Sequence, residues 1–171
     1  MRTPLTPFYR AMLGLACAAA TLVLMAQLAM ILDRLLGLGF LGGEAYAGYF
    51  LAASAFLALP DAFQRGDHIR VTLFLERFPA RARFALELLC LACGCVVIGY
   101  FAWHAGSMAW MSFVFNDASM NFDATPLWIP QSFMALGVLV LFVAMVEELC
   151  LIIVRRRILA KGSDDEPMNY E

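Results

Sequence analysis

The sequence predicts an all-α integral membrane protein with four transmembrane helices and a short amphipathic surface helix between spans two and three. Three observations lead to this fold class. Hydrophobic residues make up 63% of the 171 residues and charged residues only 15%, where soluble domains average about 45–50% and about 25%. Four apolar stretches each reach the length of about 20 residues that crosses a bilayer as a helix. Eleven of the twelve Lys and Arg residues fall on one side of the resulting topology.

The four predicted spans cover residues 11–32, 41–63, 84–115 and 127–154, within a single membrane domain of residues 1–171. Helices are expected because a spanning segment must satisfy its backbone hydrogen bonds internally. The first span is too long for the apolar core of a signal peptide, so we expect an uncleaved anchor. Pro60 is expected to close or kink the second span. Residues 155–171 form a short polar tail.

The stretch HIRVTLFLERF, residues 68–78, is the predicted surface helix. On a helical projection its apolar residues Val71, Phe74, Leu75 and Phe78 share one side. Eleven residues are too few to span a bilayer, so this helix should lie along the membrane surface or against a partner.

Basic residues set the expected orientation of the chain. They precede the first span, fill the loop between the second and third spans, and follow the fourth; Arg34 alone lies on the other side. Because positive residues stay on the cytoplasmic side, both termini and the central loop are predicted to be cytoplasmic. The net charge of −2 says nothing about a nucleic-acid partner, but no basic patch with interleaved aromatics appears, so none is predicted.

Several polar or amphipathic residues are candidates for contacts with a partner subunit or with lipid. Acids inside a span are costly and mark an ion path or a polar contact. Glu148 lies only about 10 Å along the helix from Arg155, so a contact near the headgroups is favoured over ion coupling. Tryptophan prefers the water–lipid boundary, and basic loop residues can meet anionic headgroups. The candidates are Arg65, His68, Arg70, Trp128, Glu147 and Glu148.

A membrane redox protein, using thiols or haem, is the alternative reading. Cys90 and Cys93 could form a reactive pair, but the topology places Cys90 toward the cytoplasmic end of its span, away from an oxidising compartment. His104 could ligate haem, but the other histidine, His68, lies in the central loop rather than at comparable depth. His104 is expected to bond within the bundle or to lie near the periplasmic boundary. No catalytic residue, metal site or cofactor is predicted.

Two segments carry a resemblance to a known family. RGDHIRVTLFLERFPARAR (residues 65–83) and TPLWIPQSFMALG (residues 125–137) resemble the DctQ-like small membrane subunit of tripartite ATP-independent periplasmic (TRAP) transporters. That family has an arginine and a glycine before His-Ile-x-Val, and basic residues entering span three. The matching positions here are Arg65, Gly66, His68, Ile69, Val71, Arg81 and Arg83. Thr72 departs from the pattern, since the family commonly has an acidic residue there.

The resemblance implies a function that the chain performs only with partners. A periplasmic substrate-binding protein captures an organic acid, and a large multi-span permease subunit carries it inward on a sodium gradient. The small subunit supports the large one as a non-catalytic scaffold in the bacterial inner membrane, in contact with membrane lipids. The polar tail predicts that the large subunit is a separate chain. Which organic acid is transported stays open.

Overall fold

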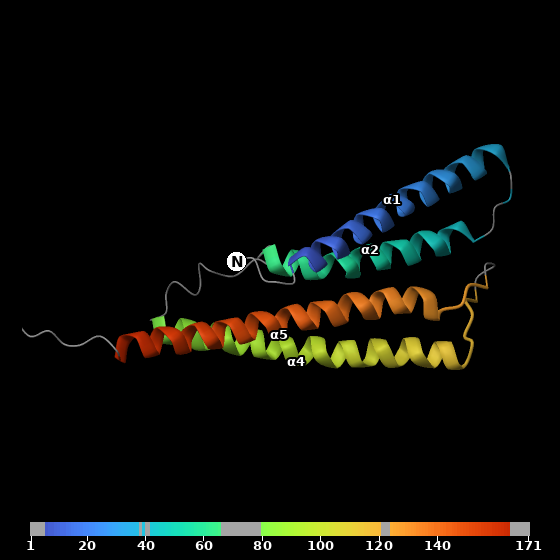
Figure 1. Ribbon diagram of the computed structural model, residues 1–171. Helices are drawn as coiled ribbons and strands as arrows, with labels where there is room; N and C mark the ends of the chain where they lie inside the picture. The colour runs from blue at the N-terminus through green and yellow to red at the C-terminus, as the bar shows by residue number, and fades with distance from the viewer. Residues whose placement is uncertain (1–5, 38, 40–41, 66–79, 121–123, 165–171) are drawn as a thin grey trace, which may run out of the picture.

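Four long helices account for most of the chain. The computed structural model describes residues 6–37, 39, 42–65, 80–120 and 124–164. The helices are α1 (Thr6–Leu36), α2 (Gly43–Arg65), α4 (Ala80–Val114) and α5 (Trp128–Asp164), shown in Figure 1. All four are long and apolar enough to cross a membrane, which confirms the predicted all-α class. The predicted surface helix over residues 68–78 lies outside the described residues.

Each predicted span corresponds to one helix, and α1, α4 and α5 are longer than the apolar stretches, whereas α2 with its 23 residues is not. α1 has 31 residues and α5 has 37, because charged ends continue the helical hydrogen bonding beyond the hydrocarbon. Pro60 does not close the second span, since α2 runs through it to Arg65; the alternative expectation, a kink at Pro60, stays a prediction. A proline inside a helix removes its own N–H donor, here the one that would bond the carbonyl of Phe56, and its ring crowds that same carbonyl.

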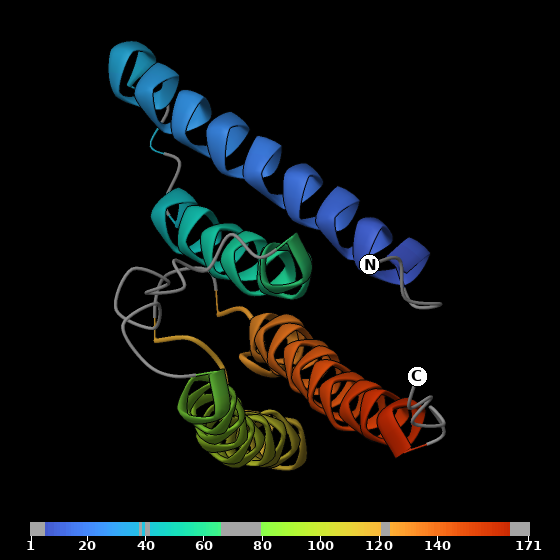
Figure 2. The ribbon, with the colours of Figure 1, turned by 90° about the vertical axis from the view of Figure 1, so that its left-hand side faces the viewer.

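The helices lie in an open row rather than in a closed bundle. α1 packs on α2, α2 on α5, and α5 on α4, and Figure 2 shows α1 and α4 at the two edges of this row. In the most apolar 18-residue stretch of each edge helix only 11% of the residues are buried. The corresponding share is 28% in α2 and 33% in α5. The two edge helices therefore keep most of their surface free of contact with the rest of the described chain.

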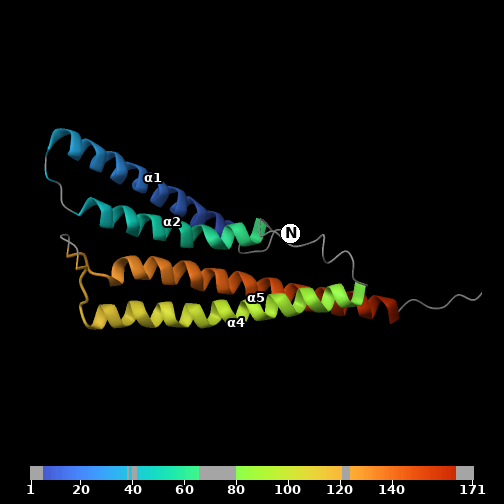
Figure 3. The same ribbon diagram turned by 180° about the vertical axis from the view of Figure 1, so that it is seen from behind.

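The hydrophobic core lies where three helices meet. Its buried residues come from the first half of α1 and from the middle of α2 and of α5: Tyr9, Met12, Ala16, Ala19, Ala53, Leu57, Val140 and Ala144. The α1 members follow a 3-4-3 spacing, which keeps one helix face against its neighbour. Beyond Ala19 no described α1 residue is buried, and Figures 1 and 3 show α1 diverging from α2 toward Leu36.

Small residues let the inner helices approach closely. A Cβ built on Gly137 of α5 would lie 2.5 Å from the carbonyl oxygen of Phe56 in α2, and one on Gly99 of α4 would lie 2.9 Å from the ring of Phe142. Such contacts are the expected basis of helix association in lipid, where apolar side chains gain nothing by leaving an apolar solvent.

Candidate functional site

Tyr9 of α1 and Glu147 of α5 are joined by a hydrogen bond between their side chains. The Tyr9 hydroxyl donates to Oε2 of Glu147 over 3.1 Å, and the Tyr9 side chain is only 1% exposed. A buried tyrosine normally finds a partner for its hydroxyl, and an acid inside a span needs a donor. The sequence left open whether Glu147 faces a partner, lipid headgroups or the bundle interior, and it did not point to Tyr9 as a partner. A rule that pairs polar side chains at equal depth would have found Tyr9, near the start of span one.

Asp61 and Arg65 form an ion pair within the last turns of α2. Nε of Arg65 donates to Oδ2 of Asp61, four residues earlier, and the Asp61 side chain is buried while that of Arg65 is more than half exposed. Such an i,i+4 pair adds little stability where both groups are exposed. Here its effect is to supply a counter-charge to a carboxylate that α2 buries. Arg65, a predicted lipid or partner contact, thus has one internal partner.

Trp128 begins α5 and lies against α4. Its ring meets that of Phe113 edge-on, with 5.6 Å between centroids, and its carbonyl accepts a bond of 2.6 Å from the Ser132 hydroxyl. Trp128 is the first residue of α5, and part of its ring surface is used for packing between helices. Its predicted contact with lipid or a partner stays a prediction.

The connection between α4 and α5 is held by its own hydrogen bonds. The N–H of Leu127 donates to the Asp117 carbonyl over 2.9 Å, and Ala118 pairs with Pro126 in an isolated bridge. The Thr125 hydroxyl donates to the Tyr46 hydroxyl over 3.3 Å, which ties this connection to the start of α2.

Less can be said of the three remaining candidate residues. Glu148 has a half-buried side chain on α5. His68 and Arg70 lie outside the described residues, so their predicted role stays a prediction.

The side chains named for the redox alternative are not assembled into a centre. Cys90 and Cys93 are free and exposed thiols on α4, and the described residues hold no group of three His, Cys, Asp or Glu side chains near enough to bind a metal. His104 points outward from α4 and packs its ring against Tyr100, with 4.3 Å between centroids. Among the described residues His104 has no hydrogen bond within the bundle, so the other expected placement, near the periplasmic boundary, is the one that stays a prediction.

The comparison with protein families decides between these readings. The family described as tripartite ATP-independent periplasmic transporters, DctQ component, matches residues 20–155 of this chain. The chain belongs to the DctQ family. No curated protein matches the sequence.

Membership of the DctQ family makes this multi-pass membrane protein the small permease component of a TRAP transporter. The match runs from within α1 to the charged end of α5, so it includes Asp61, Arg65, Trp128 and Glu147. The redox alternative is not favoured by this result.

Proposed function

We propose that this DctQ component is a non-catalytic scaffold in a sodium-coupled importer of organic acids. It supports a large permease subunit, encoded as a separate chain, that carries the substrate. A periplasmic binding protein delivers that substrate. The chain resides in the bacterial inner membrane with both termini in the cytoplasm. The family match over residues 20–155 carries this proposal.

The helices support a scaffold role rather than a transport role. Secondary transporters bind their substrate at discontinuous helices near the middle of the membrane. Each of the four described helices is continuous through its apolar, membrane-spanning segment. Tyr9 of α1 bonds to Glu147 of α5, which ties two helices together, and Asp61 and Arg65 pair with each other within α2.

Reconstitution tests the proposed function directly. Proteoliposomes that hold both membrane subunits, supplied with the binding protein, should take up an organic acid only under an inward sodium gradient. The acid is chosen beforehand as the one that raises the melting temperature of the binding protein. Omitting the small subunit should abolish uptake, and the small subunit alone should transport nothing. Uptake by the small subunit alone, or full uptake without it, would disprove the proposal.

A further inference from the structure

Polar aromatic side chains project from α4 near the middle of its apolar span. That span runs over Leu88–Val114, so its midpoint is Phe101. Tyr100, Trp103 and His104 lie within three residues of it, or about 5 Å along the helix axis. Tyr100 is 69% exposed and Trp103 is 75% exposed, and His104 is exposed as well.

These three side chains carry hydrogen-bond donors where lipid offers no acceptor. The phenol hydroxyl, the indole N–H and the protonated imidazole nitrogen all donate. None of them donates to another described residue, although the rings of Tyr100 and His104 touch. Tyrosine and tryptophan favour the membrane boundary, and a histidine inside a span marks a functional contact. Acyl chains alone are therefore a poor environment for this face.

The edge of α1 offers the contrast within the same molecule. Its exposed face is mostly aliphatic around the midpoint of the span, with Leu22, Leu24, Met25 and Leu28 about half exposed or more. Its one exposed amide there is Gln27. This edge suits lipid far better than the α4 edge does.

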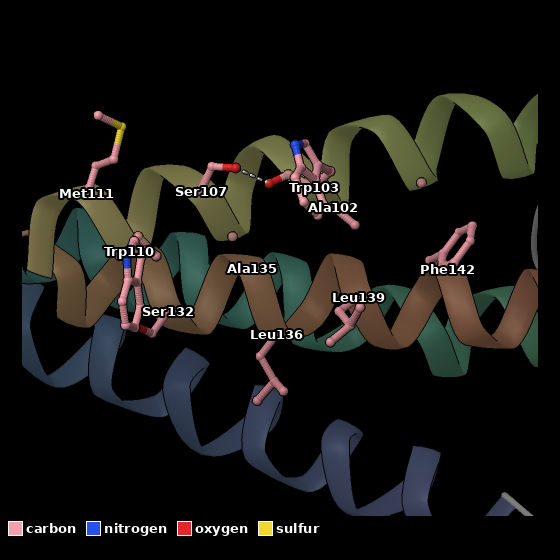
Figure 4. Close-up of a pocket in the computed structure, with 13 residues that line it drawn as sticks. Ala102, Trp103, Ser107, Trp110, Met111, Ser132, Ala135, Leu136, Leu139 and Phe142 are labelled. Carbon is pink, nitrogen blue, oxygen red and sulfur yellow. Dashed lines mark hydrogen bonds between the residues drawn. The ribbon is translucent and has the colours of Figure 1, made fainter.

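A groove runs beside the polar aromatic face. It has a volume of about 980 Å³ and is lined by small α4 residues, including Gly99, Ala102 and Gly106, and by α5 residues such as Leu139. Figure 4 shows Trp103 and Trp110 projecting from α4 along it. A Cβ added at Gly106 would meet no atom within 4 Å. Small residues at such a place let a second helix approach closely.

We infer that the α4 edge, formed by Tyr100, Trp103, His104 and the adjoining groove, is where a transmembrane helix of the large permease subunit packs. That helix places aliphatic side chains in the groove and hydrogen-bond acceptors at mid-membrane depth opposite the three donors. The α1 edge faces lipid. The inference rests on the proposed function and adds to it which face of the scaffold holds the partner.

The test uses the complete complex, with the small subunit tagged and the large subunit of the same transporter co-expressed. Two exposed helical glycines form a matched pair, because a Cβ at Gly106 and a Cβ at Gly14 of α1 both meet nothing within 4 Å. Gly106→Leu fills the groove and should lower the recovery of the large subunit in mild detergent at least tenfold. Gly14→Leu should change it less than twofold.

A second pair tests the donors. Trp103→Leu combined with His104→Leu should also lower recovery at least tenfold, whereas Gln27→Leu on α1 should leave it within twofold. A photoreactive amino acid at Trp103 should cross-link to the large subunit, and one at Met25 should cross-link to lipid. The elution volume of each isolated variant in size-exclusion chromatography shows whether the variant still folds. The cross-linking experiment does not depend on substitutions that could destabilise the chain.

The outcomes separate this inference from the proposed function. Loss of the partner with the Gly14 or Gln27 variants, but not with the α4 variants, moves the interface to α1 and overturns the inference alone. A cross-link from position 103 to a second copy of this chain, or only to phospholipid, also overturns it. If the unaltered chain recovers no large subunit, both the proposed function and the inference fail.

Discussion

Replacing Gly137 by alanine tests the contact that joins the two inner helices. The new Cβ would lie 2.5 Å from the carbonyl oxygen and 2.6 Å from the carbonyl carbon of Phe56. Both are backbone atoms, so no side-chain rotation can make room, and α2 must move away from α5. The same carbonyl lacks its helical donor because Pro60, four residues later, has no N–H.

The magnitude follows from two opposing terms. Overpacking costs about 1–3 kcal/mol, and a clash with rigid backbone belongs near the upper value. Alanine is favoured over glycine inside a helix by about 1 kcal/mol, which offsets part of this cost. The expected net loss in the free energy of unfolding is therefore about 2 kcal/mol, or about 30-fold in the equilibrium constant.

The assay is an unfolding titration of the purified chain in mixed micelles with rising dodecyl sulfate, followed by tryptophan fluorescence. Gly48→Ala is the matched control, because Gly48 is an exposed residue of α2 at which a Cβ would meet nothing within 4 Å. Only the greater helix propensity of alanine acts at that position, so the free energy of unfolding of this variant should rise by up to about 1 kcal/mol. A Gly137→Ala variant as stable as the unaltered chain would refute the described contact.

Three further outcomes are expected. Tyr9→Phe removes the donor to Glu147 and should lower stability by about 1–3 kcal/mol in the same titration; Glu147→Gln, which keeps an acceptor oxygen, should lower it less, and an equal loss would contradict the hydrogen bond. Single cysteines at Ser163 and Asn116, in a chain without its native cysteines, should react with an impermeant maleimide from opposite sides of the membrane; labelling from one side would end the predicted topology. Glu147→Gln with Glu148→Gln should leave the sodium dependence of uptake unchanged, whereas an altered sodium stoichiometry would place these carboxylates on an ion path.

Hydropathy predicted the helices well because the bilayer imposes their length. Residues 11–32 and 127–154 had to be helical, since no other single segment satisfies its backbone in hydrocarbon. The position of Trp128 at the start of α5 agrees with the same solvent boundary. Pro60 lies inside α2 without ending it, because neighbouring helices in a membrane support the backbone groups that a proline frees.

The pairing of the helices could not be predicted in the same way. A helix that is apolar on every side gives no periodic signal for the face it buries. The buried face is instead distinguished by small residues, which allow a neighbouring helix to approach: Ala16 and Ala19 on α1 and Gly137 on α5. The Tyr9–Glu147 bond joins residues 138 positions apart, and only a match of depth across two spans would have suggested it.

The open row of helices connects this fold to its proposed task. In water, exposed edges such as those of α1 and α4 would drive the row to close, because burial of apolar surface is the dominant gain. In a bilayer that gain is absent, so the two inner helices can hold the structure through close contacts such as Gly137 with Phe56. The edges then remain available, and their chemistry differs: aliphatic on α1, with hydrogen-bond donors at mid-depth on α4. A scaffold that must hold a large membrane partner on one side and meet lipid on the other requires that asymmetry.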